Sequence, residues 1–572
     1  MFRLLLFLAL ALPVNAQETM IREVFDPATD THVEVLALFS KPSPGGYLPV
    51  RVKIANNLKS DATIHLDFKS RSDYNDSLQT DSSFTFTADG GKTVTRDIFV
   101  PLSPPQGYYG STNVSATLSG SLGRANNTIN TSLSNDQPAV LLSEALFTPN
   151  ASSLDSEINS KFSSGRGSSV FAAKFDPKQL PDDWRAFSGF DSVILTDSDW
   201  SNIPPGGRNA ILSWVRLGGQ LIIDSSGSTT ASAMGLPAEA GYGRILLQSI
   251  SSGLRLNASN VVKLVCSNPN KPQQVSLRED FRTFWPLQKL FGEQTFRYAL
   301  FVIVLIIFGI LVGPVNLFVF AKSGQRHKLF ITTPLISLGA SLILIVLIIT
   351  QDGFGGSGIR RILMEVRPDT GVNAAYLHQE QFSRTGVLTR SDFTIDTPAV
   401  FAPVPIATSR WARFTDGPGA KGSFNIQPAD GKTLASGDWF QSRSEQGHVL
   451  SAVVSTRGRI EKTDRPNIFL STFEFPIDTL YYLDEAQQWH RAEGITAGKR
   501  FTLVPVEPSM VIPAVNAETN AFSDRNKQFF KIASARPGHY FAITTHAPGI
   551  DTNPGIRWKE TRTIITGPVV SP

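Results

Sequence analysis

Two uncharged stretches decide the architecture of this chain: ALFVIVLIIFGILVGPVNLFVF at residues 299–320 and LFITTPLISLGASLILIVLIIT at residues 329–350. At a rise of about 1.5 Å per residue, a helix of about 22 residues reaches about 33 Å, enough to cross a hydrocarbon core of roughly 30 Å. We therefore predict two transmembrane helices, and a buried hairpin of a soluble protein is the alternative. Neither stretch contains an ionisable residue, so a path for ions is not expected.

The loop between the two stretches, AKSGQRHK at 321–328, gives their orientation. It contains Lys322, Arg326 and Lys328 and no acidic residue. Short loops rich in lysine and arginine stay on the cytoplasmic side of a membrane. The loop is therefore predicted to be cytoplasmic, which places both long flanks of the hairpin on the extracytoplasmic side.

The N-terminus, MFRLLLFLALALPVNAQ, has the layout of a signal peptide. Arg3 precedes an apolar core at Leu4 to Leu12, and small residues follow at Val14 and Ala16. Nine apolar residues are too few for a retained anchor, since a span takes about 20. We therefore predict a signal peptide at residues 1–16 and export of the chain that follows.

The predicted helices also carry a packing pattern. Gly309 and Gly313 on the first helix, and Ser337 and Ser341 on the second, are pairs of small residues four positions apart. Such pairs let helix backbones approach closely, so we predict that these faces touch in an antiparallel hairpin. Homodimerisation through the two glycines is the alternative. Asn316 must find a hydrogen-bond partner, because an unpaired amide in lipid is costly.

Composition excludes several function classes. The single cysteine, Cys266, excludes an intramolecular disulfide and a cysteine-clustered metal site. The net charge of +4 would suggest nucleic acid as a partner, but Arg3 leaves with the signal peptide and three positive charges lie in the cytoplasmic loop. The exported part is then neutral and lacks the basic field that nucleic-acid binding uses. No nucleic-acid partner is predicted.

Residues 17–138 consist of short runs of alternating polarity separated by turn residues. The runs lie at 33–39, 48–56, 63–70, 82–88, 92–100 and 113–120. This spacing is typical of an all-β sandwich, and the region resembles the immunoglobulin-like modules of bacterial envelope proteins. Such modules usually space or bind rather than catalyse.

Residues 139–265 change to a pattern of alternating strands and helices. Apolar runs at 139–143, 169–175, 192–196 and 220–224 read as strands, and 207–217 reads as a helix that ends at two glycines. Such alternation predicts an α/β domain with a parallel sheet. A connector at 266–298 then leads to the first apolar stretch.

Within that domain, FDSVILTDSDW and AILSWVRLGGQLIID resemble the class I glutamine-amidotransferase-like fold. The resemblance implies a nucleophilic cysteine in the turn after QLIID and a histidine later in the chain. Here the turn runs from Asp224 to Gly227, Cys266 lies well beyond it, and no histidine occurs between His65 and His327. We therefore predict a copy of the fold without catalytic residues.

The same turn is the best candidate for binding chemistry. Asp224, Ser226 and Ser228 match the D-x-S-x-S spacing with which von Willebrand A-type domains hold Mg²⁺. Ligands commonly bind at the carboxyl ends of parallel strands, so these three residues are candidate ligand-binding residues. Those domains carry the motif after their first strand, whereas here it follows several others, and no resident metal or cofactor is predicted.

Residues 351–572 are predicted to form a β-rich extracytoplasmic domain. A glycine-rich stretch at 353–358 matches G-x-G-x-x-G by letter but follows a membrane helix, so it is interpreted as a flexible tether. Further runs read as strands at 448–456, 467–475, 479–483, 500–506, 527–533 and 539–547.

Taken together, the layout resembles a group of bacterial envelope membrane proteins, most specifically in GPVNLFVFAKSGQRHKLFITTP. The resemblance implies the bacterial inner membrane, with both large flanks in the periplasm, and says little about activity. Our first hypothesis is a non-enzymatic protein that binds a periplasmic or membrane protein partner or an envelope ligand, as a scaffold, assembly factor or sensor. The alternatives are a membrane-tethered hydrolase or amidotransferase using the 224–228 loop, and an accessory subunit of a transporter or secretion assembly. Homo-oligomers are compatible with all three.

Overall fold

The computed structural model describes most of the chain between residues 18 and 571. The residues it leaves undescribed are 1–17, 73–77, 105–111, 132, 134–135, 163–169, 226–229, 282–284, 295–297, 369–372, 405, 407–421, 430, 535 and 572. The predicted signal peptide, Ser226 and Ser228 therefore lie outside the described residues. The chain divides into two compact units between Val275 and Ser276, and helix α5 (Gln273–Glu279) contains the boundary.

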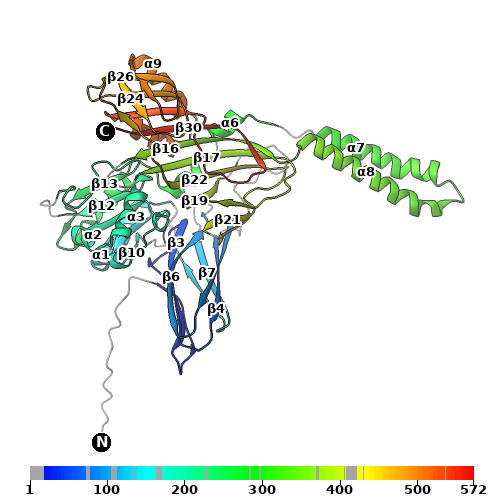
Figure 1. Cartoon of the computed structure of the whole chain (residues 1–572). Coiled ribbons are helices and arrows are strands. Elements are labelled where there is room, and N and C mark those ends of the chain that lie inside the picture. Colours follow the sequence, from blue (N-terminus) through cyan, green and yellow to red (C-terminus); the bar gives the residue numbers. More distant parts are fainter. Residues whose placement is uncertain are drawn as a thin grey trace, which may run out of the picture. The chain divides into compact units, whose positions relative to one another are not determined.

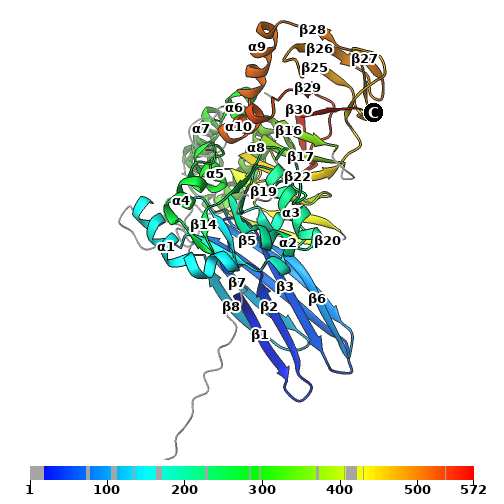
Figure 2. The same ribbon diagram turned by 90° about the vertical axis from the view of Figure 1, so that its left-hand side faces the viewer.

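The first unit begins with two antiparallel sheets that face each other. One sheet has the order β1 (Glu18–Asp26), β2 (Thr31–Ala37), β3 (Gly46–Asn56), β6 (Lys92–Leu102), and these strands lie side by side in Figure 2. The other contains β5 (Leu78–Ala88), β4 (Ala62–Ser72), β7 (Thr112–Gly120) and β8 (Ala125–Asn130). Alternate residues such as Val33 and Val35 of β2 meet Ile64 and Leu66 of β4 in one apolar core. The predicted β-sandwich is confirmed.

The rest of the first unit is built on a parallel sheet. Its order is β10 (Ala172–Phe175), β9 (Val140–Ser143), β11 (Ser192–Thr196), β12 (Gln220–Asp224), β13 (Arg244–Gln248). The helical segments around it are α1 (Glu144–Phe162), η1 (Pro177–Gln179), η2 (Trp184–Phe187), α2 (Asp197–Asn202), α3 (Pro205–Arg216) and α4 (Ala258–Cys266). A short hairpin, β14 (Ser251–Ser252) and β15 (Arg255–Leu256), precedes α4. The predicted parallel α/β layer is confirmed, and its likeness to amidotransferases stays a prediction.

The second unit contains the two apolar stretches as a helical hairpin. Helix α7 (Tyr298–Ile310) continues into the π-helical segment η3 (Leu311–Phe320), and a short turn η4 (Arg326–Lys328) leads into α8 (Leu329–Asp352). The two arms lie side by side, as Figure 1 shows, and their large apolar side chains are mostly exposed. Both arms, of 23 and 27 residues with their flanks, are long and apolar enough to cross a membrane. We call this element the apolar hairpin.

The predicted close approach at the small residues of the hairpin is not found. Among the described residues, no heavy atom lies within 4 Å of the position that a Cβ would take at Gly309 or Gly313. Ser341 is exposed and Ser337 is half-buried. The pairing of residues four positions apart assumes about 3.6 residues per turn, and the wider π-helical turns that begin at residue 311 break that assumption.

Asn316 instead holds the two arms together. Its side chain is buried, its Nδ2 donates to Thr333 Oγ1 at 2.9 Å, and its Oδ1 accepts from Thr332 Oγ1 at 2.6 Å. The partner that an amide needs in an apolar environment therefore comes from the start of α8. This contact lies towards the loop end of the hairpin, and the loop residues Lys322, Arg326 and Lys328 that connect the two arms are exposed.

After the hairpin the second unit forms a large, mostly antiparallel sheet. Its path is β19 (Ala399–Val404), β22 (Glu445–Ser455), β17 (Ala374–Thr385), β16 (Gly356–Arg367), β30 (Ile556–Val570), β29 (His539–Thr544), β25 (Ile477–Leu483), β26 (Trp489–Ile495), β28 (Val504–Pro505). Three strands branch from β30: β23 (Ile460–Lys462), β24 (Ile468–Ser471) and β27 (Arg500–Thr502). A smaller antiparallel group contains β18 (Phe393–Ile395), β21 (Lys432–Gly437) and β20 (Gly422–Ala429). The predicted β-rich C-terminal region is confirmed.

The sequence prediction of this region was wrong in two places. Residues 527–533, expected as a strand, lie in helix α10 (Asp524–Ser534), which follows helix α9 (Pro508–Thr519). The buried residues Asn526, Phe529 and Phe530 have the spacing of one helix face. The glycine-rich stretch after α8, expected as a flexible tether, is a hydrogen-bonded junction whose residue Gly356 already begins β16.

Candidate functional site

Asp224, the predicted ligand-binding carboxylate, lies at the end of β12 but is bonded inward. It is buried, and its Oδ1 accepts from the backbone N–H groups of Ile250 and Ser251 at 2.9 and 3.2 Å. Its Oδ2 accepts from the Ser251 hydroxyl. Three donors thus occupy the carboxylate, and its role here is to fasten the β14 hairpin to the carboxyl end of the parallel sheet. Ser226 and Ser228 lie outside the described residues and remain candidates from the sequence alone.

The cysteine of the first unit is also a poor candidate for chemistry, and the described residues form no cluster of metal ligands. Cys266, at the end of α4, is half-buried, and burial raises the pKa of its thiol. A thiol with a raised pKa carries little thiolate at neutral pH and is a poor nucleophile. Among the described residues, no three His, Cys, Asp or Glu side chains gather as metal ligands.

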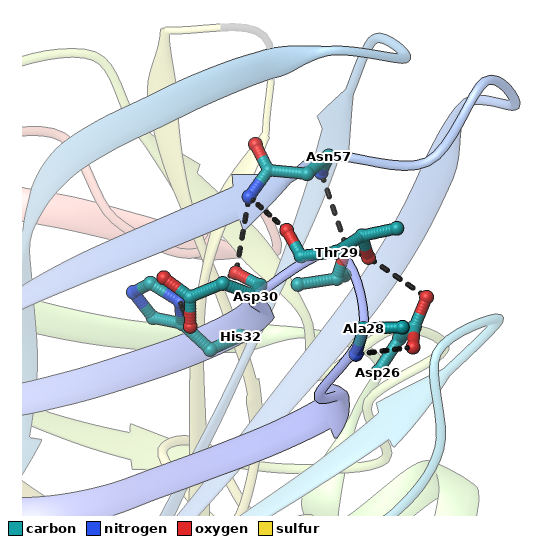
Figure 3. Close-up of polar contacts among 7 residues, drawn as sticks. Asp26, Ala28, Thr29, Asp30, His32 and Asn57 are labelled. Carbon is teal, nitrogen blue, oxygen red and sulfur yellow. Dashed lines mark hydrogen bonds and ion pairs between the residues drawn. The ribbon is translucent and has the colours of Figure 1, made fainter.

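A polar cluster at the turn between β1 and β2 satisfies its own hydrogen bonds (Figure 3). Thr29 Oγ1 donates to Asp26 Oδ2 at 2.8 Å, and Asn57 Nδ2 donates to the carbonyl oxygens of Thr29 and Asp30 at 2.8 and 3.0 Å. His32 Nδ1 lies 3.3 Å from Asp30 Oδ1, and Asp30 has a φ of 54°, in the left-handed region. These contacts fix the tight turn, as short polar side chains commonly do, and they explain the cluster without a ligand.

The feature that stands out in the second unit is the junction between the apolar hairpin and the large sheet. The chain enters the hairpin through helix α6 (Pro286–Phe291) and leaves it at Asp352. The entry contacts strand β17. The exit contacts the residues that follow β17 and those that precede β22. We call these contacts the hairpin junction, and they consist of an entry clamp and an exit clamp.

The centre of the entry clamp is Glu380, a carboxylate with no exposed surface in the middle of β17. Trp285, immediately before α6, donates its Nε1–H to Oε2 at 2.8 Å. Ser523 donates its backbone N–H at 3.0 Å and its hydroxyl at 2.6 Å to Oε1, and Asn526 Nδ2 donates to Oε1 at 2.6 Å. Burial raises the pKa of Glu380, and the hydrogen bonds from Ser523 and Trp285 act in the opposite direction. One buried side chain therefore joins the residues that precede the hairpin to β17 and α10.

A second carboxylate completes the same arrangement. Asp280 Oδ2 accepts from the Ser276 hydroxyl at 2.7 Å and from the backbone N–H of Arg525 at 3.0 Å. Asp280 and Glu380 thus both accept backbone N–H groups at the start of α10. A helix N-terminus carries a partial positive charge and free N–H groups, which stabilise carboxylates placed there. This explains why the fold tolerates two buried acids at this point.

Arg384, four residues further along β17, holds the other side of the entry. Its guanidinium donates to Glu445 Oε1 of β22 at 2.6 and 2.8 Å. It also donates to the carbonyl oxygen of Gly292 at 2.7 Å and to Gln294 Oε1 at 3.2 Å, and it lies 4.9 Å from the ring centre of Phe291. The segment that follows α6 is therefore fixed to the sheet by a paired arginine, which supplies several donors in one plane.

The exit clamp leaves no free linker between α8 and β16. Asp352, the last residue of α8, pairs with Arg443 at 2.6 Å. The backbone N–H of Gly355 donates to Val387, and that of Val387 donates back to Gly353, both at 2.9 Å. Gly386 lies so close that a Cβ on it would be 2.3 Å from the carbonyl oxygen of Asp352. The hairpin thus passes directly into the sheet.

Sequence reasoning did not identify the residues of the hairpin junction. Strand β17 contains four consecutive buried polar residues, His378, Gln379, Glu380 and Gln381. Because apolar and polar residues do not alternate in this run, the sequence pattern does not indicate a strand there. Trp285 shortly before an apolar stretch was the one available signal, and its partner lies far away in sequence.

Comparisons with known proteins name no relative. No family model matches the chain, and no curated protein matches it. A solved cycloisomaltooligosaccharide glucanotransferase of Paenibacillus sp., complexed with cycloisomaltoheptaose, is 16% identical over 29% of this chain and 20% of its own, with a TM-score of 0.14. The CBM22-1 and GH10 modules of Clostridium thermocellum endo-1,4-beta-D-xylanase 10B, complexed with xylohexaose, are 10% identical over 38% of this chain and 44% of theirs, with a TM-score of 0.13. The chain spans less than half the length of either structure, and likenesses of this size assign neither fold nor function.

Fold and site therefore define the class of this protein coarsely. It is a multidomain chain with β-rich and parallel α/β parts and two helices long enough and apolar enough to cross a membrane. Its most distinctive site is a buried junction at the base of those helices.

Proposed function

We propose that this chain is a non-enzymatic membrane protein of the bacterial cell envelope. Its apolar hairpin is anchored in the inner membrane, with residues 321–328 in the cytoplasm. Both large flanks lie in the periplasm, where they bind a protein partner or an envelope ligand, as a scaffold, assembly factor or sensor. The orientation is supported by the three exposed positive charges of the loop, since such loops stay in the cytoplasm.

The observation that carries this proposal is the double fastening of the hairpin. A protein that only needs a membrane anchor can use a flexible linker, whereas here both the entry and the exit are fixed to one sheet by Glu380, Arg384 and the Asp352–Arg443 pair. Such an attachment sets the height and orientation of the C-terminal domain above the bilayer. Control of position is useful to a protein that presents a binding surface to a partner in the same membrane.

The enzymatic alternative loses support at Asp224. The carboxylate that would lead a 224–228 site is occupied by donors from Ile250 and Ser251. Replacing Asp224, Ser226 and Ser228 together by alanine tests this alternative. We expect the phenotype of the gene to persist while the protein still accumulates, and loss of the phenotype at normal protein level would favour an enzyme. A subunit of a transporter or secretion assembly differs from our proposal only in the partner.

The topology is tested with single cysteines in a Cys266→Ser background. A membrane-impermeant maleimide should label Thr128→Cys and Lys499→Cys on spheroplasts, and it should label Ser323→Cys only after lysis. The reverse pattern, or extraction of the full chain by alkaline carbonate, would contradict membrane anchoring as proposed. Photocrosslinking from exposed positions of the periplasmic domains, followed by mass spectrometry, then identifies the partner.

A further inference from the structure

Large apolar side chains are exposed at the base of the hairpin, at the end of one membrane-spanning arm or just outside it. Phe354, just past the end of α8, is 67% exposed, and Tyr298, the first residue of α7, is 63% exposed. Leu290 on α6 is 56% exposed. All three flank the same end of the hairpin, because α6 leads into α7 and Phe354 follows α8. A soluble surface rarely concentrates side chains of this kind without a partner.

Positive charge is exposed beside them. Strand β30 runs parallel to β16 from its first residue, with Gly356 opposite Ile556 and Ser357 opposite Arg557. Arg557 and Lys559 are exposed there, and Lys559 Nζ lies 5.2 Å from the ring centre of Phe291 on α6. The start of β30 therefore brings two cations to the base of the hairpin.

Acidic groups at the base are mostly neutralised by arginines. Asp352 pairs with Arg443, Glu445 with Arg384 and Glu560 with Arg361. Glu293 is the exposed acid on the entry side. On the β30 side Asp551 also pairs with Arg360, at 3.0 Å. Arg557 and Lys559 are the exposed cations that remain at the start of β30.

We propose that Leu290, Tyr298, Phe354, Arg557 and Lys559 form an interfacial collar that binds the headgroups of anionic phospholipids around the hairpin. The inference rests on the proposed membrane anchoring and adds the lipid class that the base of the hairpin selects. Aromatic side chains gather at the headgroup level of bilayers, and cations close to the surface attract anionic lipids. The collar is continuous with the apolar hairpin, so its occupant is the lipid that surrounds the same helices.

The test measures which lipid lies next to the collar. The full chain with Cys266→Ser and Thr350→Cys carries a fluorophore at residue 350, an exposed position near the end of α8 that is not part of the collar. It is reconstituted into vesicles of phosphatidylcholine and phosphatidylglycerol. Quenching by headgroup spin-labelled phosphatidylglycerol is compared with quenching by equally labelled phosphatidylcholine at the same mole fraction. We expect stronger quenching by the anionic lipid, by roughly twofold or more at low salt, and a smaller difference as salt screens the charges.

Charge variants make the test specific to the collar. Arg557→Gln with Lys559→Gln should bring the ratio of the two quenching efficiencies close to one. The matched control is Lys499→Gln with Arg500→Gln, two exposed cations at the start of β27 and immediately before it. Strand β27 pairs with β24, and β24 pairs with β23, which meets the far end of β30 where Ile460 lies opposite Val569. The control should leave the ratio unchanged. Equal loss in both variants would overturn the collar in favour of net charge, and a ratio of one in the parent would overturn it outright.

The two proposals fail in different ways. If alkaline carbonate releases the full chain from membranes, the membrane anchoring itself is wrong. If the chain resists extraction but shows no preference for the anionic lipid, only the collar is wrong. Membrane yield and circular dichroism of each variant show that it has folded.

Discussion

A single carboxylate, Glu380, shows how the fold handles a charge that water cannot reach. A buried acid is costly unless its oxygens are hydrogen-bonded, and Glu380 accepts from Trp285, Ser523 and Asn526. Two of these partners, Ser523 and Asn526, lie at the N-terminal end of α10, where the helix favours negative charge. The same residue that is expensive to bury therefore specifies which segments meet at the base of the hairpin.

Replacing Glu380 by alanine should weaken the hairpin junction. The change leaves several buried donors without an acceptor, and each buried donor left unsatisfied costs about 1–3 kcal/mol. We expect a lower unfolding temperature of the detergent-solubilised chain and faster proteolysis around α6. Glu380→Gln should be intermediate, because one amide oxygen remains as an acceptor. Glu474→Ala, at an exposed position, is the control, and equal effects in the two alanine variants would contradict the role assigned to Glu380.

His448 on β22 should make the second unit sensitive to acid. Its ring is buried against Phe401, Trp439 and Phe440, and burial lowers its pKa from 6.5 to about 4. The unfolded chain then binds a proton at higher pH than the folded chain. The contribution of the neutral His448 ring to the free energy of unfolding is therefore complete above about pH 6.5 and is lost as pH falls towards about 4. The free energy lost over this range is about 3 kcal/mol.

Chemical unfolding of the solubilised chain between pH 7 and pH 4 measures the slope of the free energy of unfolding against pH. His448→Phe should flatten it, whereas His546→Gln, at a side chain 53% exposed, should leave it in place. An unchanged slope in His448→Phe would show that other groups cause the acid sensitivity.

At the residue scale, the sequence predicted chemistry from spacing and could not see partners. The D-x-S-x-S spacing placed Asp224 correctly at the end of a strand, but the donors that occupy it come from residues 250 and 251, after an intervening strand. Asn316 was the opposite case. Its need for a partner followed from its chemistry alone, and the structure supplies Thr332 and Thr333.

At the scale of elements, regular patterns were predicted well and polar buried strands were not. The six expected runs of the sandwich overlap β2 to β7, and the four expected strands of the α/β region overlap β9 to β12, because their apolar residues alternate or are continuous. Strands β1, β8 and β13 were not expected. Strands β16 and β17 were missed, because arginine, glutamate and glutamine occupy their buried positions. The sequence predicts a strand where helix α10 lies, because two adjacent phenylalanines between lysines do not distinguish the helical period of about 3.6 residues from the strand period of about 2.

The arms of the hairpin should crosslink near the loop and not at the glycines. With Cys266→Ser, cysteines at Asn316 and Thr332 should be joined by a short bismaleimide, since the native side chains are in hydrogen-bond contact. Cysteines at Gly313 and Ser337 should give little intramolecular product, because the space beside Gly313 is open. Efficient joining of the second pair would restore the small-residue interface, and dimers joined through Gly313 would indicate self-association.

The exit clamp should be sensitive to the smallest addition of volume. Gly386→Ala places a Cβ against the backbone oxygens of Asp352 and Gly353, which must move apart. Overpacking of this kind costs about 1–3 kcal/mol, which we expect as a lower unfolding temperature. Gly309→Ala meets open space and should have almost no effect. Equal tolerance at both positions would mean that the end of α8 is loosely held.

At the scale of the whole molecule, the order of parts was readable and their attachment was not. Composition and periodicity separated a β-rich start, an α/β region, two apolar helices and a β-rich end. The sequence predicts a flexible tether between α8 and β16, because glycine-rich segments usually behave as flexible linkers. Here Gly353 and Gly355, both with positive φ, allow a close backbone turn instead.

If both clamps hold, the hairpin and the large sheet should move as one body. Spin labels at Ile345→Cys on α8 and at Lys499→Cys, immediately before β27, in the Cys266→Ser background, should give a narrow distance distribution in lipid nanodiscs. Glu380→Ala combined with Arg443→Gln removes the centre of the entry clamp and the charge partner of Asp352. We expect this pair to broaden the distribution, because each remaining contact alone leaves one side of the hairpin free to pivot. Glu474→Ala should not. A narrow distribution that survives loss of both clamps would mean that packing around α6 and β16, rather than the buried polar contacts, fixes the domain at the membrane.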